Sequence, residues 1–315
     1  MKCIVIGGTG HIGTYLIPRL VDLGAEITVV SRQQREPYQP NGAWKYVKQV
    51  SLDREALEKQ NTFGEKIREL NPDVVIDLIC FTPESNQQLV DALRGHVQHF
   101  LHCGTIWTHG PSVEVPTTEA TPRRPFGEYG INKAKIEEDL LNEAQRNGFP
   151  ASILHPGHIV GLGWNPLNPA GHFNNKVFET LAKGETLALP NFGLETVHHV
   201  HADDVAQSFI KAMLNWSSAV GESFHTVSPQ ALTLRGYAER MALWFGQEAR
   251  LEFLPWNEFK QTISEQEAQA VWDHIEHSPN CSIAKAQKLI NYQPRYSSLE
   301  AVQESVRYLL DKGLI

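Results

Sequence analysis

The sequence predicts an α/β protein built on a doubly wound parallel sheet. Through residues 2–155, short apolar segments alternate with amphipathic segments of helical period, which is the pattern of parallel strands covered by helices on both faces. A glycine-rich loop at residues 7–13 directly follows the first apolar segment. Residues 157–173 are rich in glycine, proline and asparagine without a period, which is typical of a loop. These observations predict a strand-and-helix domain followed by a smaller, mixed region.

Each element is expected where the spacing of its apolar residues fits a strand or a helix. Strands are predicted at residues 2–6, 26–30, 44–49, 73–79, 97–103, 151–155, 196–200 and 223–227. Helices are predicted at residues 11–23, 53–70, 84–94, 128–146, 174–182, 203–215, 233–245, 258–275, 282–290 and 299–312. Crossovers between parallel strands are expected to be right-handed. The predicted division is a first domain of residues 1–155, to which residues 196–230 return, and a second region of residues 156–195 and 231–315.

Composition and charge narrow the classes of function. The chain has 315 residues and a formal net charge of −8, with 41% hydrophobic and 20% charged residues. An acidic chain has no surplus of cations for nucleic-acid phosphates or an anionic membrane, so neither is expected as a partner. No apolar run approaches the roughly 18 residues of a membrane span, and the first apolar stretch is too short for a secretory leader. A cytoplasmic protein is therefore expected.

The four cysteines are expected to be reduced and structural. They are Cys3, Cys80, Cys103 and Cys281, and no two of them have Cys-x-x-Cys spacing. Three of them lie in apolar, strand-like segments, where a thiol packs as a small hydrophobic group.

The glycine loop indicates a dinucleotide site. Gly7, Gly10 and Gly13 are spaced as G-x-x-G-x-x-G between a predicted strand and a predicted helix. A diphosphate bound there needs backbone N–H groups at contact distance, and a Cβ at the tight positions would block that approach. His11 and Ile12 complete the turn into the helix and are expected to border the cofactor. The alternative is a purely structural glycine turn.

The end of the second strand is where such proteins read the adenosine ribose. An acidic residue there favours NAD, whereas this chain has Ser31 followed by Arg32. A guanidinium can pair with a 2′-phosphate, so NADP is somewhat favoured over NAD. The alternative is that Arg32 is a solvated surface residue.

A threonine, a tyrosine and a lysine form the candidate catalytic group. Tyr129 and Lys133 lie one helical turn apart, which places both on one face of a helix. Thr105 follows the end of the predicted strand at residues 97–103. A free phenol has a pKa near ~10, and the positive charge of a nearby lysine favours its ionised form. The group therefore suits proton transfer to or from a substrate oxygen.

Together these motifs resemble the extended short-chain dehydrogenase/reductase superfamily, and within it the NAD-dependent epimerase/dehydratase family. The resemblance covers nearly the whole chain and adds Asp73-Val74-Val75-Ile76, Glu137, His155-Pro156-Gly157, His201-Ala202-Asp203-Asp204-Val205, Ala284-Lys285-Ala286 and Tyr292-Gln293-Pro294 to the motifs above. It implies that Tyr129 acts as general acid or base and that Thr105 orients the substrate oxygen. It also implies that Lys133 holds the cofactor ribose and that Pro156 borders the cofactor.

The resemblance implies a Rossmann-type doubly wound parallel sheet with a smaller C-terminal substrate-binding domain. The expected function is that of an NAD(P)-dependent epimerase/dehydratase-like oxidoreductase, acting by hydride transfer on a sugar or sugar-like hydroxy or carbonyl substrate. One alternative is an NADPH-dependent carbonyl reductase. Another is a nucleotide-sensing or RNA-associated binding protein without catalysis.

Related enzymes commonly pair through two helices, so a homodimer is expected. The helices predicted at residues 84–94 and 128–146 carry Leu89, Leu93, Ile136 and Leu140 at helical spacing. The alternative is that this apolar stripe faces only the chain's own sheet.

Three features depart from the family pattern. No aspartate follows the third strand at residues 49–51, and Ile79 and Cys80 stand where a small residue is usual. Residues 195–199 contain no arginine to bind a substrate diphosphate. This last departure argues against a UDP-sugar substrate.

Histidines and aromatic residues are frequent in the half expected to face the substrate. The histidines there are His155, His158, His172, His198, His199 and His201, and none has metal-ligand spacing, so no metal is expected. They are expected to pack or to bind substrate through hydrogen bonds. Trp107, Phe126, Trp164 and Phe192 are expected either to line the pocket or to belong to the core.

Overall fold

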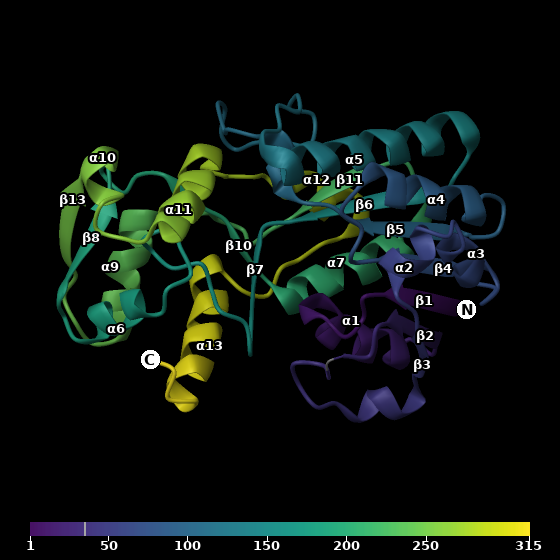
Figure 1. Ribbon diagram of the computed structural model, residues 1–315, viewed down its shortest axis with the longest axis horizontal. Helices are drawn as coiled ribbons and strands as arrows, with labels where there is room; N and C mark the ends of the chain where they lie inside the picture. The colour runs from purple at the N-terminus through teal and green to yellow at the C-terminus, as the bar shows by residue number, and fades with distance from the viewer. Residues whose placement is uncertain (35) are drawn as a thin grey trace.

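The computed structural model describes residues 1–34 and 36–315 and confirms the predicted α/β fold. Figure 1 shows a layered strand-and-helix body that carries the N-terminus and, beside it, a smaller lobe of helices and short strands near the C-terminus. The sheet of the larger body has seven strands in the order β11-β6-β5-β4-β1-β2-β3, and all its neighbouring pairs are parallel. The strands are β1 (Lys2–Ile6), β2 (Glu26–Ser31), β3 (Lys48–Ser51), β4 (Val74–Asp77), β5 (His99–Cys103), β6 (Ala151–Pro156) and β11 (Ser223–Thr226).

Alternate residues of each strand enter two separate cores, one on each face of the sheet. In β1, Cys3 and Val5 belong to the first core, whereas Ile4 and Ile6 belong to the second. The first core is covered by α1 (His11–Asp22), α7 (Ala202–Leu214) and α12 (Ala284–Ile290). The second is covered by α3 (Phe63–Arg68), α4 (Pro83–Leu93) and α5 (Gly127–Asn147). Side chains of period two therefore produce the doubly wound layers.

Two predicted helices are interrupted. The helix expected at residues 53–70 is divided into α2 (Arg54–Glu58) and α3, because Asn61 between them takes a left-handed φ of 54°. The helix expected at residues 258–275 is divided into α10 (Trp256–Phe259) and α11 (Glu265–His277), the second beginning at a capping box on Ser264. The strand expected at residues 44–49 starts later, since Gly42–Tyr46 forms the 3-10 helix η1.

The smaller lobe has its own core. It is built around two parallel strands that the sequence did not predict, β8 (Thr186–Pro190) and β13 (Arg250–Leu254). The other elements there are α6 (Lys176–Ala182), α9 (Leu234–Trp244), α10, α11 and α13 (Ser298–Asp311). Two short ladders pair β7 (His158–Val160) with β10 (His199–His201), and β9 (Thr196–Val197) with β12 (Leu232–Thr233). Figure 1 shows β7 and β10 where the chain passes between the lobes. The short elements η2 (Ile106–His109) and α8 (Trp216–Ala219) complete the fold.

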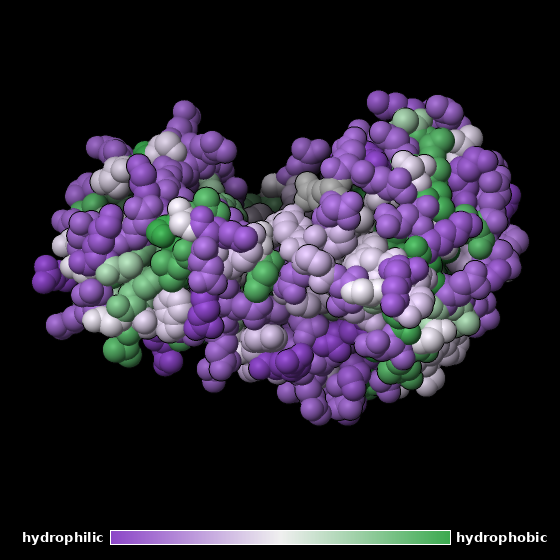
Figure 2. All heavy atoms as spheres, turned by 90° about the horizontal axis from the view of Figure 1, so that it is seen from below, coloured by the Kyte–Doolittle hydropathy of each residue, from purple (hydrophilic) through white to green (hydrophobic). Residues whose placement is uncertain are grey.

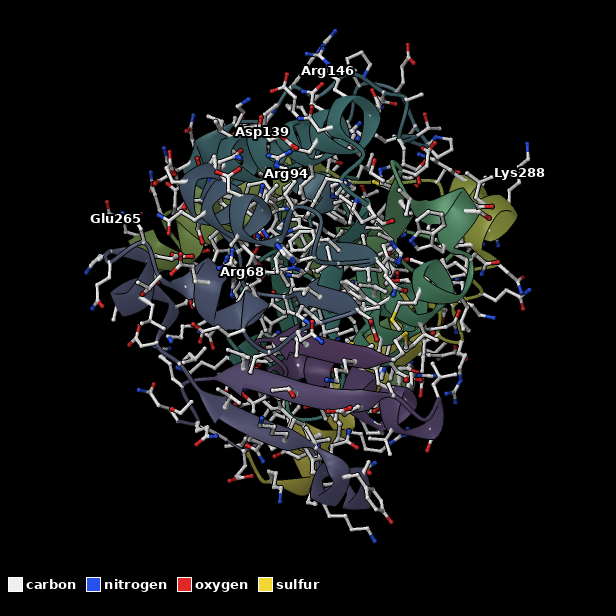
Figure 3. The ribbon with its side chains drawn as sticks, turned by 90° about the vertical axis from the view of Figure 1, so that its right-hand side faces the viewer. Arg68, Arg94, Asp139, Arg146, Glu265 and Lys288 are labelled. Carbon is white, nitrogen blue, oxygen red and sulfur yellow. The ribbon has the colours of Figure 1, made fainter. Side chains whose placement is uncertain are left out.

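The apolar stripe expected to form a dimer interface packs inside the chain, so it does not form that interface, and the homodimer stays a prediction. Leu89, Leu93, Ile136 and Leu140 are fully buried in the core beneath α4 and α5. The outer surface of these helices is charged, and Figure 3 shows Arg94 and Asp139 on it. Arg94 joins the two helices by an ion pair with Glu143. Among the residues that the structure describes, no helix is long and apolar enough to cross a membrane.

Candidate active site

The predicted site residues meet at the carboxyl edge of the large sheet. β1 lies between β2 and β4, so the chain changes direction across the sheet at this point, and ligands of such sheets bind outside the carboxyl ends of these strands. Figure 1 shows that this edge faces the smaller lobe. Figure 2 shows that the surface is hollowed between the two lobes.

The glycine loop has the geometry of a diphosphate cradle. Gly7 takes a left-handed φ of +83°, and a Cβ on it would lie 2.6 Å from the Ile79 side chain. A Cβ on Gly13 would lie 2.0 Å from the backbone oxygen of Gly8, so α1 can start this close to the loop only with glycine. At Gly10, by contrast, a Cβ would meet only the Gly7 oxygen, at 3.3 Å, and otherwise points into open space.

The first turn of α1 is suited to an anion. No side chain caps this helix, and its first turn contains no acidic residue. Uncapped N–H groups at a helix N-terminus carry partial positive charge and bind phosphate. The open side of Gly10, the tight turn at Gly7 and these N–H groups therefore fit the diphosphate of a dinucleotide.

His11 and Ile12 lie at this turn, but their side chains point into protein. The His11 ring is stacked on Trp164, with the ring centroids 4.6 Å apart, and Ile12 is part of the core. Only their backbone N–H groups are therefore placed to serve a ligand. Trp164, expected either to line the pocket or to belong to the core, packs on His11 over the glycine turn.

Ser31, Arg32 and Pro156 lie at the carboxyl edge of the sheet or directly after it. The Ser31 hydroxyl accepts a hydrogen bond from the Gln33 backbone N–H, and Arg32 is exposed. Pro156 is the buried last residue of β6, paired in register with Thr226.

The structure brings Thr105, Tyr129 and Lys133 together. Thr105 directly follows Gly104 at the end of β5, and its hydroxyl accepts a hydrogen bond from the Trp107 backbone N–H at 3.3 Å. Tyr129 lies in the first turn of α5, and its hydroxyl is hydrogen-bonded to the Thr105 side chain. One turn later, the Lys133 Nζ donates to the backbone oxygens of Cys80, at 2.6 Å, and Cys103, at 2.7 Å.

Burial keeps the Tyr129 phenol protonated. The residue exposes 42% of its surface, whereas its hydroxyl oxygen lies among protein atoms. This burial, together with the nearby Cys103, raises the pKa of Tyr129 to about 12, although the hydrogen bond from Thr105 acts to lower it. Burial also lowers the pKa of Lys133, because the charged ammonium loses water. At neutral pH Tyr129 is therefore a proton donor in this structure.

A buried relay behind Thr105 was not predicted. The backbone N–H of Thr105 donates to His155 Nδ1 at 3.0 Å, and His155 Nε2 lies 3.0 Å from Glu137 Oε1. Arg123 donates to both carboxylate oxygens of Glu137, at 2.9 and 2.5 Å. Although burial alone would raise the pKa of Glu137, His155 and Arg123 hold it well below its usual range. The relay fixes the backbone that carries the Thr105 hydroxyl.

Rings from both lobes border the site, and we call six of them the ring wall. Its members are Trp107, Phe126, His158, Phe173, His274 and His277. The edge of Trp107 contacts Tyr129, with ring centroids 6.1 Å apart. Phe192, expected either to line the pocket or to belong to the core, does neither and is 72% exposed in the turn after β8.

Most of the remaining predicted histidines have structural hydrogen bonds. His198 bonds the Ser228 oxygen and the Cys281 N–H, and His199 bonds the Leu167 oxygen. His201 caps α7, and His172 is bonded within its own loop. Within residues 1–34 and 36–315, no group of three or more His, Cys, Asp or Glu side chains could hold a metal ion.

The relay makes Glu137 important for stability. Glu137→Ala should lower the free energy of unfolding by about 3–5 kcal/mol, because it leaves Arg123 and His155 without their buried carboxylate. The matched control is Glu138→Ala on the same helix, whose carboxylate is 64% exposed and should cost about 0.5 kcal/mol or less. Urea unfolding at pH 7 measures both. Equal losses in the two variants would show that the relay is not stabilising.

The contribution of Glu137 to the free energy of unfolding depends on pH. The pKa of Glu137 is lower in the folded protein than in the unfolded chain, where it is about 4.3. Its contribution is therefore fully present above that value and is lost as the pH falls below it. The difference between wild type and Glu137→Ala should accordingly shrink on acidification.

Comparison with known proteins shows which protein family this chain matches. The model of the NAD dependent epimerase/dehydratase family matches residues 3–225. The chain is 26% identical over 241 residues to the 2′-dehydrokanamycin reductase of Streptomyces kanamyceticus, a match that covers 76% of this chain and 66% of that reductase. It is 24% identical over 330 residues to the chloroplast stem-loop binding protein of 41 kDa b of Arabidopsis thaliana, covering 99% of this chain and 79% of that protein.

Solved structures show the same fold. The UDP-glucose 4-epimerase of Thermotoga maritima, determined with UDP-glucose, superposes with a TM-score of 0.74 at 19% identity, covering 100% of both chains. The UDP-glucuronic acid 4-epimerase of Bacillus cereus in complex with NAD gives 0.72 at 17% identity, covering 99% of both. Because the family model spans most of the chain, the protein belongs to the NAD dependent epimerase/dehydratase family.

Proposed function

We propose that this protein is an NAD(P)-dependent oxidoreductase acting on a hydroxyl or carbonyl carbon of a sugar-like substrate. The observation that carries the proposal is the meeting of Thr105, Tyr129 and Lys133 beside the glycine loop, at the carboxyl edge of the sheet. A phenol and a hydroxyl that share a hydrogen bond can both reach one substrate oxygen. Membership of the family supports the same class of reaction.

Each residue has a distinct role in this proposal. The N–H groups of the glycine turn would hold the diphosphate of the dinucleotide, and Lys133 its ribose. The bound nicotinamide would supply the hydride acceptor or donor. Tyr129 would transfer a proton at the substrate oxygen, while Thr105 would donate a hydrogen bond to it as charge develops.

Tyr129 could donate the proton that a carbonyl reduction needs. A phenol whose pKa is about 12 holds its proton at neutral pH, as the general acid of a carbonyl reduction must. For Tyr129 to act as a base at neutral pH, its pKa would have to fall. Each unit of that fall requires its ionised form to be stabilised by about 1.4 kcal/mol. The likeness to a curated reductase supports the same direction. On that likeness we favour carbonyl reduction, with an internally recycled epimerisation as the alternative.

A binding protein without catalysis is the second candidate. It is favoured by the match to a chloroplast stem-loop binding protein along 99% of this chain. The net charge of −8 opposes it, because RNA binding depends on cations that neutralise phosphate. A stem-loop RNA retained by the protein at physiological salt would support this candidate.

Conservative substitutions should separate chemistry from binding. Tyr129→Phe removes one oxygen and should slow turnover about 10²- to 10⁴-fold with cofactor affinity unchanged. Thr105→Val should slow turnover and leave cofactor affinity unchanged. Lys133→Met should slow turnover and also lower cofactor affinity. The assay follows absorbance of the reduced cofactor with a panel of sugars and small carbonyl compounds. A Tyr129→Phe variant as fast as wild type would remove Tyr129 from the mechanism.

The cofactor preference depends on Arg32 in this proposal. Because Arg32 is exposed and follows the Ser31 strand end, its guanidinium is free to pair with a 2′-phosphate. NADP should bind at least as tightly as NAD, and Arg32→Ala should weaken NADP selectively. Calorimetric titration of both nucleotides tests this. An equal loss of affinity for the two would show that Arg32 does not read the phosphate.

A further inference from the structure

We propose that the ring wall is the substrate subsite and that it takes a polyhydroxy or amino-sugar compound presenting hydrogen-bond donors, not a nucleoside diphosphate sugar. This inference rests on the proposed function, since it names the substrate class for the same site. It is carried by the position of Trp107, by two imidazole nitrogens without partners and by the lack of a cation in the wall.

The ring wall begins at the predicted reaction centre. Trp107 lies two residues after Thr105, in η2, and its edge contacts Tyr129. Its face is stacked on His277 of α11, with centroids 4.1 Å apart and planes at 16°. His277 in turn contacts Phe126 at 4.0 Å. A substrate whose oxygen reaches Tyr129 and Thr105 therefore lies against rings from both lobes.

Two imidazoles of the wall present acceptor nitrogens. His274 Nδ1 lies 2.5 Å from the Ala270 oxygen, and His277 Nδ1 lies 2.6 Å from the Asp273 oxygen. Because a carbonyl oxygen can only accept, each Nδ1 carries the proton and each Nε2 is a bare acceptor. Both Nε2 atoms are buried, and neither has a hydrogen-bond partner among the residues described.

The unpartnered Nε2 acceptors of His274 and His277 favour a ligand that carries hydrogen-bond donors. A buried polar atom without a partner is rare in a folded protein and points to a missing partner. Burial lowers the pKa of His274 to about 4 and also lowers that of His277, so both rings are neutral at neutral pH. Neutral imidazoles with free Nε2 atoms match hydroxyl or amino groups and offer no donor to a phosphate oxygen.

The wall also lacks the cations that a diphosphate requires. None of its six members is charged at neutral pH, since burial also keeps the pKa of His158 well below its ordinary value. Of the two arginines before Phe126, Arg123 is already paired with Glu137, and Arg124 is exposed. Diphosphate groups are usually bound by arginine or lysine with charge-assisted hydrogen bonds. The wall therefore suits an uncharged or amino-bearing sugar.

Equilibrium binding to the cofactor-saturated protein tests the substrate class. Saturation with NADP occupies the glycine loop, so a nucleotide can bind only at the substrate side. D-glucose, D-glucosamine, myo-inositol, trehalose, UDP and UDP-glucose are the probes, followed by ligand-observed NMR and calorimetry. We expect saturable binding of at least one of the first four and none of UDP.

Three variants locate the binding. His274→Phe and His277→Phe keep a ring in the wall and remove the acceptor, so each should weaken the bound sugar about 5-fold, which corresponds to about 1 kcal/mol. His274→Gln, which restores an acceptor, should recover part of the affinity. The matched control is His96→Phe, at an exposed turn after α4, which should change nothing. Cofactor affinity should be the same in all of these proteins.

The outcomes separate this inference from the proposed function. Tight binding of UDP or UDP-glucose, abolished by Arg124→Gln, would overturn the substrate class while leaving an oxidoreductase in place. No binding of any of the four sugar and polyol probes would also overturn it. If the sugar binds as expected and Tyr129→Phe turns it over as fast as wild type, the subsite stands and the proposed catalytic role fails.

Discussion

The arrangement of the site depends on one buried cation. Lys133 exposes only 2% of its surface. Its ammonium donates to the backbone oxygens of Cys80, just after β4, and of Cys103, at the end of β5. A buried charge without partners is very costly, so these hydrogen bonds fix the helix α5 against the two strand ends. Once α5 is fixed, its spacing of four residues places Tyr129 beside Thr105 and Glu137 beside His155.

The same face of α5 therefore serves chemistry at one end and stability at the other. Tyr129 lies in the first turn of α5, and Glu137 lies about two turns further along, next to Arg123. The relay through His155 reaches the Thr105 backbone from behind. Trp107, two residues after Thr105, meets histidines of α11, and the proposed substrate would bind there. Elements of the larger body carry Thr105, Tyr129 and Lys133, and α11 of the smaller lobe supplies two histidines of the ring wall.

Local patterns predicted most of the large sheet because its central strands, such as β1 and β4, are apolar on both faces and its long helices have a clear period. They failed where tertiary contacts decide. β8 and β13 are short strands that pair only with each other, and nothing in Thr186–Pro190 marks its distant partner. The apolar stripe of α4 and α5 was read as an interface because a period shows that a face is buried, not what buries it.

The candidate site was predictable as far as its motifs lie within single segments. The glycine loop, Thr105 and the Tyr129–Lys133 pair could be found from the sequence, because strand, turn and helix spacing determine their placement. Arg123 and the histidines of α11 could not, since their roles arise only when the chain brings them to Glu137 and Trp107. A useful signal was nonetheless present, because Glu137 follows Lys133 by one helical turn and so shares its buried face.

The proposed function requires first that a dinucleotide binds on the open side of Gly10. Fluorescence titration of the protein with NADH and NADPH, alongside a Gly10→Val variant, tests it most directly. Gly10 has an extended backbone that valine can adopt, and a side chain there meets only the Gly7 oxygen. The account predicts saturable enhancement of nicotinamide emission by the wild type, and loss of binding in a variant whose unfolding free energy is unchanged within about 0.5 kcal/mol. Equal binding by the two proteins, or none by the wild type, would contradict it.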